Sequence, residues 1–337
     1  MRAAATIAAV GTAATVMYVA QDAMPAGSFL AKEMTPMQKE FAAFVAKFNK
    51  SYGTTEEYEA RLALFAKRHH EIAQHNMQGK SWTLAHNKMS DWTDAERKLV
   101  SGYIPTVRDV DAEKLDTVGI PSSVNWQNQL QSMSVIKDQG QCGSCWAFST
   151  IGSVESHTEI QNGIYTSLSE QQLVDCSTWN NGCGGGNFDL AFDYLQGKGS
   201  MTEADYPYTA ADGTCAYNSA QVANHHVTGY HDVTPYDSAQ LKAAVAMGPV
   251  SIAIQANQYV FQSYSSGVIA NDGSCGEQLD HAVLAIGYGH ESGKDFVLVR
   301  NSWGSTWGDN GLVKLELGPY SAACGAVDQP SRVKTNA

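Results

Sequence analysis

Cys145 is the residue of this chain best suited to nucleophilic chemistry. It is one of seven cysteines, so three disulfides would leave one thiol free. It lies in the segment QGQCGSCW (residues 139–146), where two glycines predict a turn and the apolar residues that follow recur at helical spacing. A thiol in the first turn of a partly buried helix is favoured as the thiolate, the nucleophilic form. The alternatives are a buried structural cysteine or a disulfide to Cys142, although that bridge would strain the helix start.

A general base and a residue that orients it can both come from one predicted hairpin. Residues 281–289 and 295–301 are apolar, strand-like segments around a turn at 289–293. If this hairpin is symmetric about Glu291, His281 and Asn301 lie directly opposite each other on one face of the sheet. A neutral amide there accepts the imidazole N–H without titrating. A one-residue bulge would break this pairing, and a lone histidine is more often a structural residue.

These residues resemble the motifs of papain-like cysteine proteases of the cathepsin L type. Residues 142–146 match the signature CG(S/A)C(W/Y), and His281 and Asn301 follow Cys145 by 136 and 156 residues. Residues 301–308, NSWGSTWG, match a second signature. The resemblance implies an α+β, papain-like fold of two lobes, one helical and one β-barrel-like, with the active-site cleft between them. It also implies a small α-helical pro-domain before the enzyme.

The resemblance gives each catalytic candidate a role in peptide-bond hydrolysis. Cys145 would be the nucleophile, and His281 the base that holds it as an ion pair and then protonates the leaving amine. Asn301 would orient His281. Gln139 would donate to the oxyanion together with the backbone N–H of Cys145. The implied activity is that of a thiol endopeptidase made as a zymogen.

The same resemblance names the substrate-binding positions. Trp303 would shield the hydrogen bond between histidine and asparagine from water, and Trp307 would lie on the leaving-group side of the cleft. The glycine run at 184–186 leaves backbone free to pair with an extended substrate. The positions matched to this pairing and to the pocket for the second residue before the scissile bond are Gly185, Gly186, Asn187, Phe188, Ala253, Leu279, Ala282 and Gln329.

That pocket sets specificity in the family, and its residues predict a preference for apolar side chains. A small Ala253 beside Phe188 leaves room for Leu, Phe or Val. Gln329 stands where some relatives carry Glu and accept Arg, so apolar residues are expected to be preferred over basic ones. A slip of one residue would place Asp328 there and reverse the expectation.

The other six cysteines predict disulfides, but spacing alone allows 15 pairings. The resemblance implies the pairs Cys142 with Cys183, Cys176 with Cys215, and Cys275 with Cys324. Such bridges require an oxidising maturation route. A zinc site is the alternative, but a second Cys-x-x-Cys pair is missing from the sequence. We therefore expect no metal and no cofactor.

Composition divides the chain near residue 120. Residues 1–119 hold no cysteine and no net charge, whereas 120–337 hold all seven cysteines and the whole net charge of −12. Nucleic acid is not an expected partner, because it would need a basic face. The expected segments are a signal peptide (1–23), an inhibitory propeptide (24–119) and the mature protease (120–337). The last is long enough for two lobes.

Residues 3–20 form an apolar run after Arg2 that is typical of a secretory signal. A signal anchor is the alternative, since the run is near the short limit for a membrane span. We expect passage through the secretory pathway to a lysosome, a vacuole or the medium. The mature enzyme is expected to be a monomer without a stable membrane span, and to act on proteins and peptides.

The expected propeptide carries two motifs. Six residues at helical spacing resemble the interspersed motif of cathepsin L-type pro-regions, with Arg68 replacing the usual Asn: Glu57, Arg61, Phe65, Arg68, Ile72 and Asn76. Residues 85–91, AHNKMSD, resemble the short Gly-x-Asn-x-Phe-x-Asp motif except at Ala85 and Met89. In this family the pro-segment covers the nucleophile in reverse direction until acid loosens it. Candidate triggers are carboxylates and the histidines His69, His70, His75 and His86.

Two other functions are compatible with parts of the sequence. An exopeptidase could block its cleft with His225 and His226, but no insertion surrounds them, and a pro-region without cysteine cannot supply a disulfide-tethered remnant. A non-catalytic inhibitor of other proteases is the second alternative. The intact set of Cys145, His281, Asn301 and Gln139 argues against it.

Overall fold

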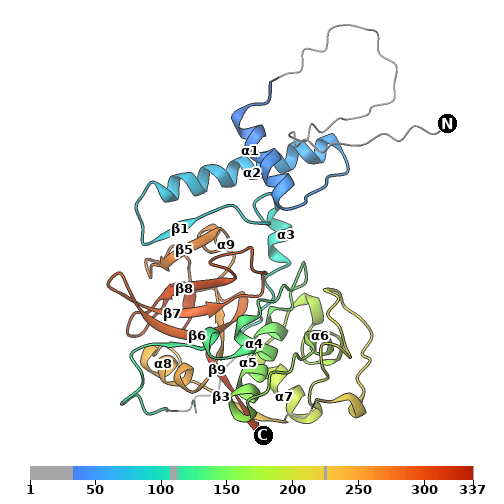
Figure 1. Ribbon diagram of the computed structural model, residues 1–337, viewed down its shortest axis with the longest axis vertical. Helices are drawn as coiled ribbons and strands as arrows, with labels where there is room; N and C mark the ends of the chain where they lie inside the picture. The colour runs from blue at the N-terminus through green and yellow to red at the C-terminus, as the bar shows by residue number, and fades with distance from the viewer. Residues whose placement is uncertain (1–32, 107–111, 113, 224–225, 337) are drawn as a thin grey trace, which may run out of the picture.

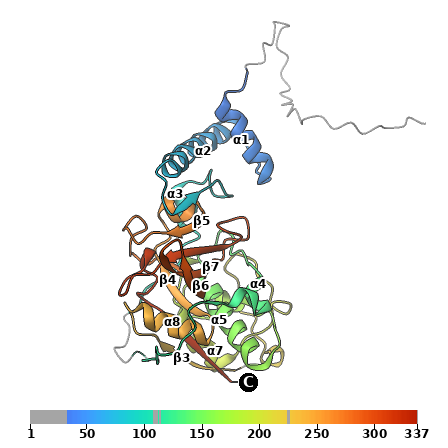
Figure 2. The same ribbon diagram turned by 60° about the vertical axis from the view of Figure 1, so that its left-hand side comes forward.

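The computed structural model describes residues 33–106, 112, 114–223 and 226–336, so the expected signal peptide lies outside the described residues. A helical module formed by α1 and α2 stands above a two-lobed body (Figure 1, Figure 2). The helices are α1 (Pro36–Lys47), α2 (Thr55–Asn76), α3 (Asp94–Lys98), α4 (Gln131–Ser134), α5 (Cys145–Asn162), α6 (Glu170–Cys176), α7 (Phe188–Lys198), α8 (Ser238–Met247) and α9 (Tyr259–Gln262). The strands are β1 (Trp82–Leu84), β2 (Val124–Asn125), β3 (His226–Asp232), β4 (Val250–Ile254), β5 (Tyr264–Ile269), β6 (His281–Glu291), β7 (Lys294–Arg300), β8 (Leu312–Glu316) and β9 (Ser331–Asn336).

One lobe is built from helices around α5. This helix is buried on all sides from Cys145 to Thr158, so it is a central helix and not the partly buried one that its apolar spacing predicts. It ends at Gly163, which adopts the left-handed conformation (φ 74°) that a helix C-terminus commonly needs. Helix α7 packs on it, and Phe192 and Leu195 extend the core (Figure 1).

The other lobe is a mostly antiparallel sheet in the order β1-β5-β8-β7-β6-β4-β9-β3, with β2 on β6. Nine consecutive residues of β6, starting at His281, are buried because α5 packs against the strand and α8 also contacts it. The two lobes therefore meet along β6. The predicted α+β architecture of two lobes preceded by a helical module is confirmed.

The hairpin of β6 and β7 turns later than its sequence predicts. Glu291 pairs with Lys294, which leaves a two-residue turn of Ser292 and Gly293 with positive φ at both positions (50° and 81°). The expected five-residue turn symmetric about Glu291 is wrong, and a bulge within β6 shifts the register again. His281 consequently lies beyond the part of β6 that pairs with β7.

The helical module attaches to the body through a strand. Strand β1 pairs antiparallel with β5 at the edge of the sheet, and Trp82 is buried there. Asn76, the last residue of α2, holds β1 in place, because its side chain makes two hydrogen bonds of 2.9 Å with the backbone of Leu84. All six residues of the interspersed motif lie on α2. One of them, Arg61, binds both carboxylate oxygens of Glu96 at 2.6 and 2.7 Å and so joins α2 to α3.

Three disulfides brace the body in the pairing that the resemblance implies, Cys142–Cys183, Cys176–Cys215 and Cys275–Cys324. Bridges of this kind typically stabilise a domain by about 2–4 kcal/mol each. The described part of the chain has no helix with the length and apolar character that crossing a bilayer requires.

Candidate active site

Cys145 is the first residue of α5 and the one cysteine outside the disulfides. Its side chain is fully buried, and its sulfur accepts a hydrogen bond of 3.4 Å from the backbone N–H of Ala282. The thiol of the helical lobe therefore touches the first residues of β6 in the sheet lobe. His281 is the neighbour of Ala282 in the chain, so the candidate base comes next to the candidate nucleophile.

His281 and Asn301 make the contact that the sequence predicts, although the predicted register is wrong. The ring nitrogen Nε2 lies 2.8 Å from Asn301 Oδ1, and the same oxygen accepts the backbone N–H of Ser302 at 2.8 Å. An oxygen that accepts from a backbone N–H is an acceptor for the ring too, so Nε2 carries the proton. In the neutral ring Nδ1 is then the unprotonated nitrogen. It is buried and has no hydrogen-bond partner among the described residues.

Two tryptophans cover this pair. The ring of Trp303 lies 4.8 Å from that of His281, centroid to centroid, and is almost completely buried. Trp307 packs edge to face on Trp303 at 5.2 Å, and its indole N–H donates to the carbonyl of Gln262. Asn87 of the short pro-region motif donates to the same carbonyl at 2.7 Å, so the helical module docks beside these rings.

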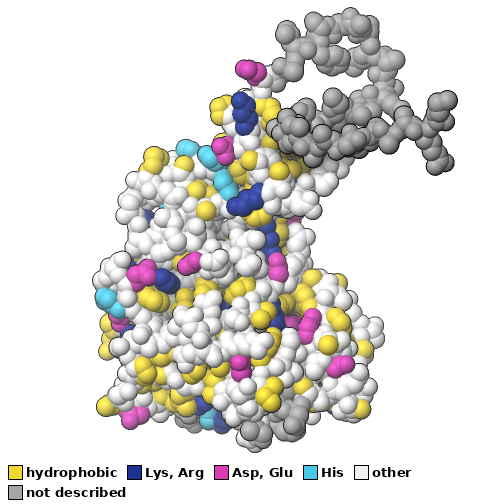
Figure 3. Space-filling view, in the orientation of Figure 1, with side chains coloured by type: hydrophobic (Ala, Val, Ile, Leu, Met, Phe, Trp, Pro, Cys, Tyr) yellow, Lys and Arg dark blue, Asp and Glu magenta, His cyan; other side chains and the backbone are white. Residues whose placement is uncertain are grey.

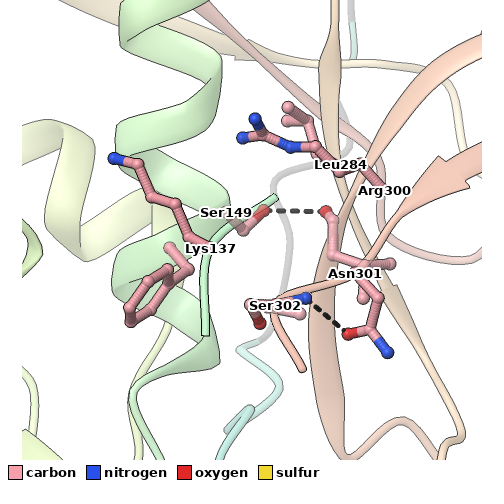
Figure 4. Close-up of a pocket in the computed structure, with 9 residues that line it drawn as sticks. Lys137, Ser149, Leu284, Arg300, Asn301 and Ser302 are labelled. Atoms are coloured by element: carbon pink, nitrogen blue, oxygen red, sulfur yellow. Dashed lines mark hydrogen bonds between the residues drawn. The ribbon is translucent and has the colours of Figure 1, made fainter. Parts of the chain in front are cut away.

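Gln139 is buried and its amide faces the site. Its Oε1 accepts from Ser302 Oγ at 2.6 Å, which leaves Nε2 as the donor. Nε2 donates to the carbonyls of Cys142 (2.8 Å) and Val100 (3.2 Å). Behind Asn301 and Ser302 a cavity of about 10 Å³ lies between Ser149 and Arg300 (Figure 4). It is about the size of one water molecule, so a substrate would have to bind on the opposite side.

That opposite side is occupied by residues 100–106, here called the covering segment. The carbonyl of Val100 accepts from Gln139 and from the indole N–H of Trp303 (3.3 Å). Gly102 then crosses so close to Cys145 that an added Cβ would lie 2.0 Å from the carbonyl oxygen of Gly143. Only glycine fits there without displacing backbone.

The covering segment next pairs with the glycine run. Gly186 donates to the carbonyl of Gly102 and accepts from the N–H of Ile104, both at 2.8 Å, in a parallel bridge. A Cβ on Gly185 would meet that same Gly102 carbonyl at 2.6 Å, so Gly185 also needs to be glycine. Sequence reasoning missed Val100, Gly102 and Tyr103. A glycine followed by an aromatic residue near the end of the pro-region was the available signal.

Tyr103 fills the pocket predicted for the second residue before the scissile bond. Its ring stacks on Phe188 at 5.0 Å, and its hydroxyl donates to Gln329 Oε1 at 2.6 Å. The remaining predicted pocket residues lie in contact with this cluster or bond to the tyrosine: Asn187, Ala253, Leu279 and Ala282. Asp328 packs near Gly325 instead, where burial raises the pKa of its carboxyl to about 6. Of these two residues, Gln329 is therefore the one that bonds to Tyr103.

Burial under the covering segment keeps both catalytic candidates neutral. It raises the pKa of the Cys145 thiol to about 11. Hydrogen bonds from the N–H groups of Ala282 and Gly102 lower this pKa, but by less than burial raises it. Burial likewise lowers the pKa of His281 to about 4, although the hydrogen bond to Asn301 opposes the shift. A thiolate favoured by the helix start is therefore not present in the covered site. Desolvation is the largest cause of both pKa shifts.

Comparison with known proteins agrees with this geometry. Residues 120–333 match the family model described as papain family cysteine protease, and residues 41–96 match that of the cathepsin propeptide inhibitor domain (I29). A cathepsin L of Sarcophaga peregrina is 42% identical over 300 residues, which cover 83% of this chain and 88% of that protein. The probable cysteine protease RD21B of Arabidopsis thaliana is 44% identical over 270 residues, 78% of this chain, but the chain spans only 58% of its length.

A solved structure is similar over nearly its whole length. The digestive procathepsin L2 proteinase from the larval midgut of Tenebrio molitor superposes with a TM-score of 0.82 at 37% identity, covering 88% of this chain and 99% of that one. The regions matched by the two family models include the free cysteine and the histidine with its asparagine (120–333) and most of the helical module (41–96). This chain therefore belongs to the papain family of cysteine proteases and carries a cathepsin propeptide inhibitor domain before the protease domain.

Proposed function

We propose that this protein is the zymogen of a thiol endopeptidase in which Cys145 attacks the peptide carbonyl. The observation that carries the proposal is the fixed tautomer of His281, since Asn301 holds the proton on Nε2 and leaves Nδ1 free to take one. This base immediately precedes Ala282, whose backbone N–H contacts the thiol. A free thiol, an oriented base and an amide donor are what acyl transfer by cysteine needs.

The reaction starts once the covering segment has left and water reaches the site. The thiol proton then passes to Nδ1 of His281, and the sulfur forms a bond to the substrate carbonyl carbon. The carbonyl oxygen becomes an oxyanion near Nε2–H of Gln139 and the backbone N–H of Cys145. His281 returns the proton to the leaving amine as the C–N bond breaks. A water molecule, deprotonated by the same ring, hydrolyses the thioester and releases the acid.

The covering segment suits the role of an inhibitor. It places a glycine at Cys145 and offers the Val100 carbonyl to Gln139, so the donor proposed for the oxyanion is already occupied. It meets the Trp303 side first and the Gly186 side last, and it runs parallel to Gly186. A substrate is expected to run antiparallel to Gly186. The covering segment runs the other way, so its carbonyl groups are not presented to Cys145 as those of a substrate would be.

We expect the pocket to select apolar side chains over basic ones. Its walls are Phe188, Ala253 and Ala282, and its polar residue Gln329 is uncharged. A fluorogenic peptide with Leu at the second residue before the scissile bond should be cleaved with a kcat/KM at least about tenfold above that of the Arg peptide. Gln329→Glu should improve the Arg peptide, whereas Asp328→Glu should not. Equal cleavage of the two peptides by the wild type would contradict the pocket assignment.

We expect acid to loosen the propeptide by protonating its histidines and not by breaking the ion pair of Arg61 and Glu96. The bond from Arg61 lowers the pKa of Glu96 to about 2, so that pair persists at pH 4.5. His86 differs, because burial lowers its pKa to about 4 with His69, Arg68 and Lys47 adding repulsion. Its ring stacks on Phe65 at 4.1 Å and lies 3.2 Å from His69, nitrogen to nitrogen. Burial also lowers the pKa of His75.

These lowered pKa values make the helical module less stable at acid pH. A histidine whose pKa is lower in the folded module binds a proton only on unfolding, so stability is present above pH 6.5 and is lost as pH falls toward 4. For the partly exposed His86 the loss is about 2 kcal/mol after allowance for solvent screening. Histidine side chains are visible on the surface of the module in Figure 3, and exposed His70 supplies a matched control.

His86→Phe keeps the stack on Phe65 but cannot titrate. We therefore expect zymogen processing at pH 4.5, relative to pH 7, to be roughly tenfold or more slower than for wild type. The ratio between variant and wild type at each pH removes the pH dependence of the enzyme itself. His70→Phe should leave that ratio unchanged. An unaltered pH profile for His86→Phe would exclude this histidine as a trigger.

Maturation near Ile120 is part of the same proposal. Val118 is 84% exposed and its neighbours are accessible, so a protease can reach this junction. The carbonyl of Pro121 accepts from Tyr288 at 2.8 Å, which holds the start of the mature enzyme on the body. The proposed segments remain 1–23, 24–119 and 120–337. The three disulfides support a secretory route, and we propose a lysosome, a vacuole or the medium as the destination.

A further inference from the structure

The pocket that holds Tyr103 ends in the side-chain amides of Asn187 and Gln329, here called its polar floor, and these two groups match a phenol. The hydroxyl of Tyr103 donates to Gln329 Oε1 at 2.6 Å and accepts from Asn187 Nδ2 at 3.1 Å. Both hydrogen-bonding functions of the hydroxyl are thus used although the side chain is only 5% exposed. Tyr103 stands in here for the side chain of a substrate residue.

The apolar part of the pocket fits the ring of the same residue. Phe188 stacks against it, and Ala253 and Ala282 are small enough to leave room beside it. An aliphatic side chain could enter this space but would leave the two amides without partners. A basic side chain would meet no carboxylate among the residues that bond to Tyr103.

Asn187 is held in the orientation that presents its donor. Its Oδ1 accepts the backbone N–H of Asp189 at 2.8 Å and caps α7, so Nδ2 must face away from the helix. Among the described residues, the partners of Nδ2 are Tyr103, Ile104 and Thr106, all of the covering segment.

Gln329 depends on the covering segment in the same way. Its side chain bonds to Tyr103 and to the carbonyl of Thr106, at 3.4 Å, within the described part of the chain. When the covering segment leaves, the buried donor of Asn187 and the half-buried acceptor of Gln329 become available to a substrate side chain. A buried polar group left unpaired is costly, so a substrate that satisfies both is favoured.

We propose that Asn187 and Gln329 make this protease select tyrosine at the second residue before the scissile bond. The inference rests on the proposed function and narrows its apolar preference to one side chain. Two matched hydrogen bonds predict a kcat/KM about tenfold higher for a Tyr peptide than for the otherwise identical Phe peptide. Because the two peptides differ by one hydroxyl, their ratio reports on the floor of the pocket alone.

The test uses processed wild-type enzyme and two substitutions of the floor. Gln329→Met removes the acceptor at nearly constant size, and Asn187→Asp keeps the helix cap but removes the donor. Each substitution removes one of the two hydrogen bonds, so each should lower the Tyr to Phe ratio to about threefold. Asp328→Asn, which makes no bond to Tyr103, should keep the wild-type ratio. The melting temperature of each variant separates misfolding from altered recognition. If one variant does not fold, the other alone tests the proposal.

The outcomes are distinct. A wild-type Tyr to Phe ratio of one or less, or a ratio that survives both substitutions, overturns this inference while peptide cleavage still supports the protease itself. No cleavage of any peptide by processed enzyme overturns the proposed function instead. A tenfold ratio that each substitution lowers to about threefold supports recognition of the phenol.

Discussion

Cys145→Ala should abolish peptide hydrolysis, with kcat lowered by at least about 10⁴-fold. Alanine leaves α5 and the core intact but removes the only cysteine that is not in a disulfide. No nearby group among the described residues offers a second thiol, and binding with oxyanion donors alone cannot replace covalent catalysis. The measurement is hydrolysis of a fluorogenic peptide at pH 5 with a reducing agent present.

The experiment needs care because this variant cannot process itself. A trace of tagged wild-type enzyme can mature it and then be removed on the tag. Ser144→Ala is a matched control, since the Ser144 hydroxyl bonds to Tyr208 and makes no direct bond to Gln139, Cys145 or His281. The bond from Tyr208 to the Gln139 carbonyl remains in the variant, so activity should stay within severalfold of wild type. Residual activity of Cys145→Ala above about 1% would refute Cys145 as the nucleophile.

Gln139→Ala should lower kcat by about 10²–10³-fold, the usual loss when one oxyanion donor is removed. Its Nε2–H already binds a carbonyl oxygen, that of Val100, in the covered enzyme. The backbone N–H of Cys145 remains in the variant, so activity should fall without vanishing. Gln141→Ala, an exposed residue of the same turn, should behave as wild type.

A second measurement separates this donor from the reactivity of the thiol. Alkylation of Cys145 by iodoacetamide forms no oxyanion, so it depends on the thiol and His281 but not on Gln139. Gln139→Ala should therefore be alkylated at a rate close to that of wild type while hydrolysis is slow. If both rates fell together, Gln139 would instead be a residue that positions Cys145 or His281.

The six residues of the interspersed motif show what a pattern can and cannot predict. Their spacing places them on one helix, as observed for α2, because helical periodicity is local. Their individual contacts are not local. Arg61 binds Glu96 on α3, and Asn76 holds Leu84 of β1, and neither partner can be read from the helix itself.

In the hairpin of β6 and β7, the predicted contact is present although the predicted local structure is wrong. Its turn was placed wrongly, because Ser292 and Gly293 form a two-residue turn, and the bulge in β6 was not located. His281 nevertheless contacts Asn301. His281 is the first residue of β6 and pairs with Ile254 of β4, not with a residue of β7. Its contact with Asn301 therefore does not depend on the symmetry of the hairpin.

Residue types and their spacing were sufficient to show which side chains are available for chemistry and which family they resemble. A single unpaired cysteine at a helix start, a histidine and an asparagine downstream, and a cysteine-free helical pro-region are all properties of residue type and spacing. Such properties survive errors of register, because they do not require any particular contact.

The protonation states and the partners of these side chains follow from contacts between distant segments. The proton on Nε2 of His281, the raised pKa of Cys145 and the placement of Tyr103 between Asn187 and Gln329 all arise where separate segments meet. Desolvation and hydrogen bonding act through neighbours in space, and the neighbours here come from the propeptide and both lobes. For that reason a thiolate expected from one helix is a neutral thiol in the covered enzyme.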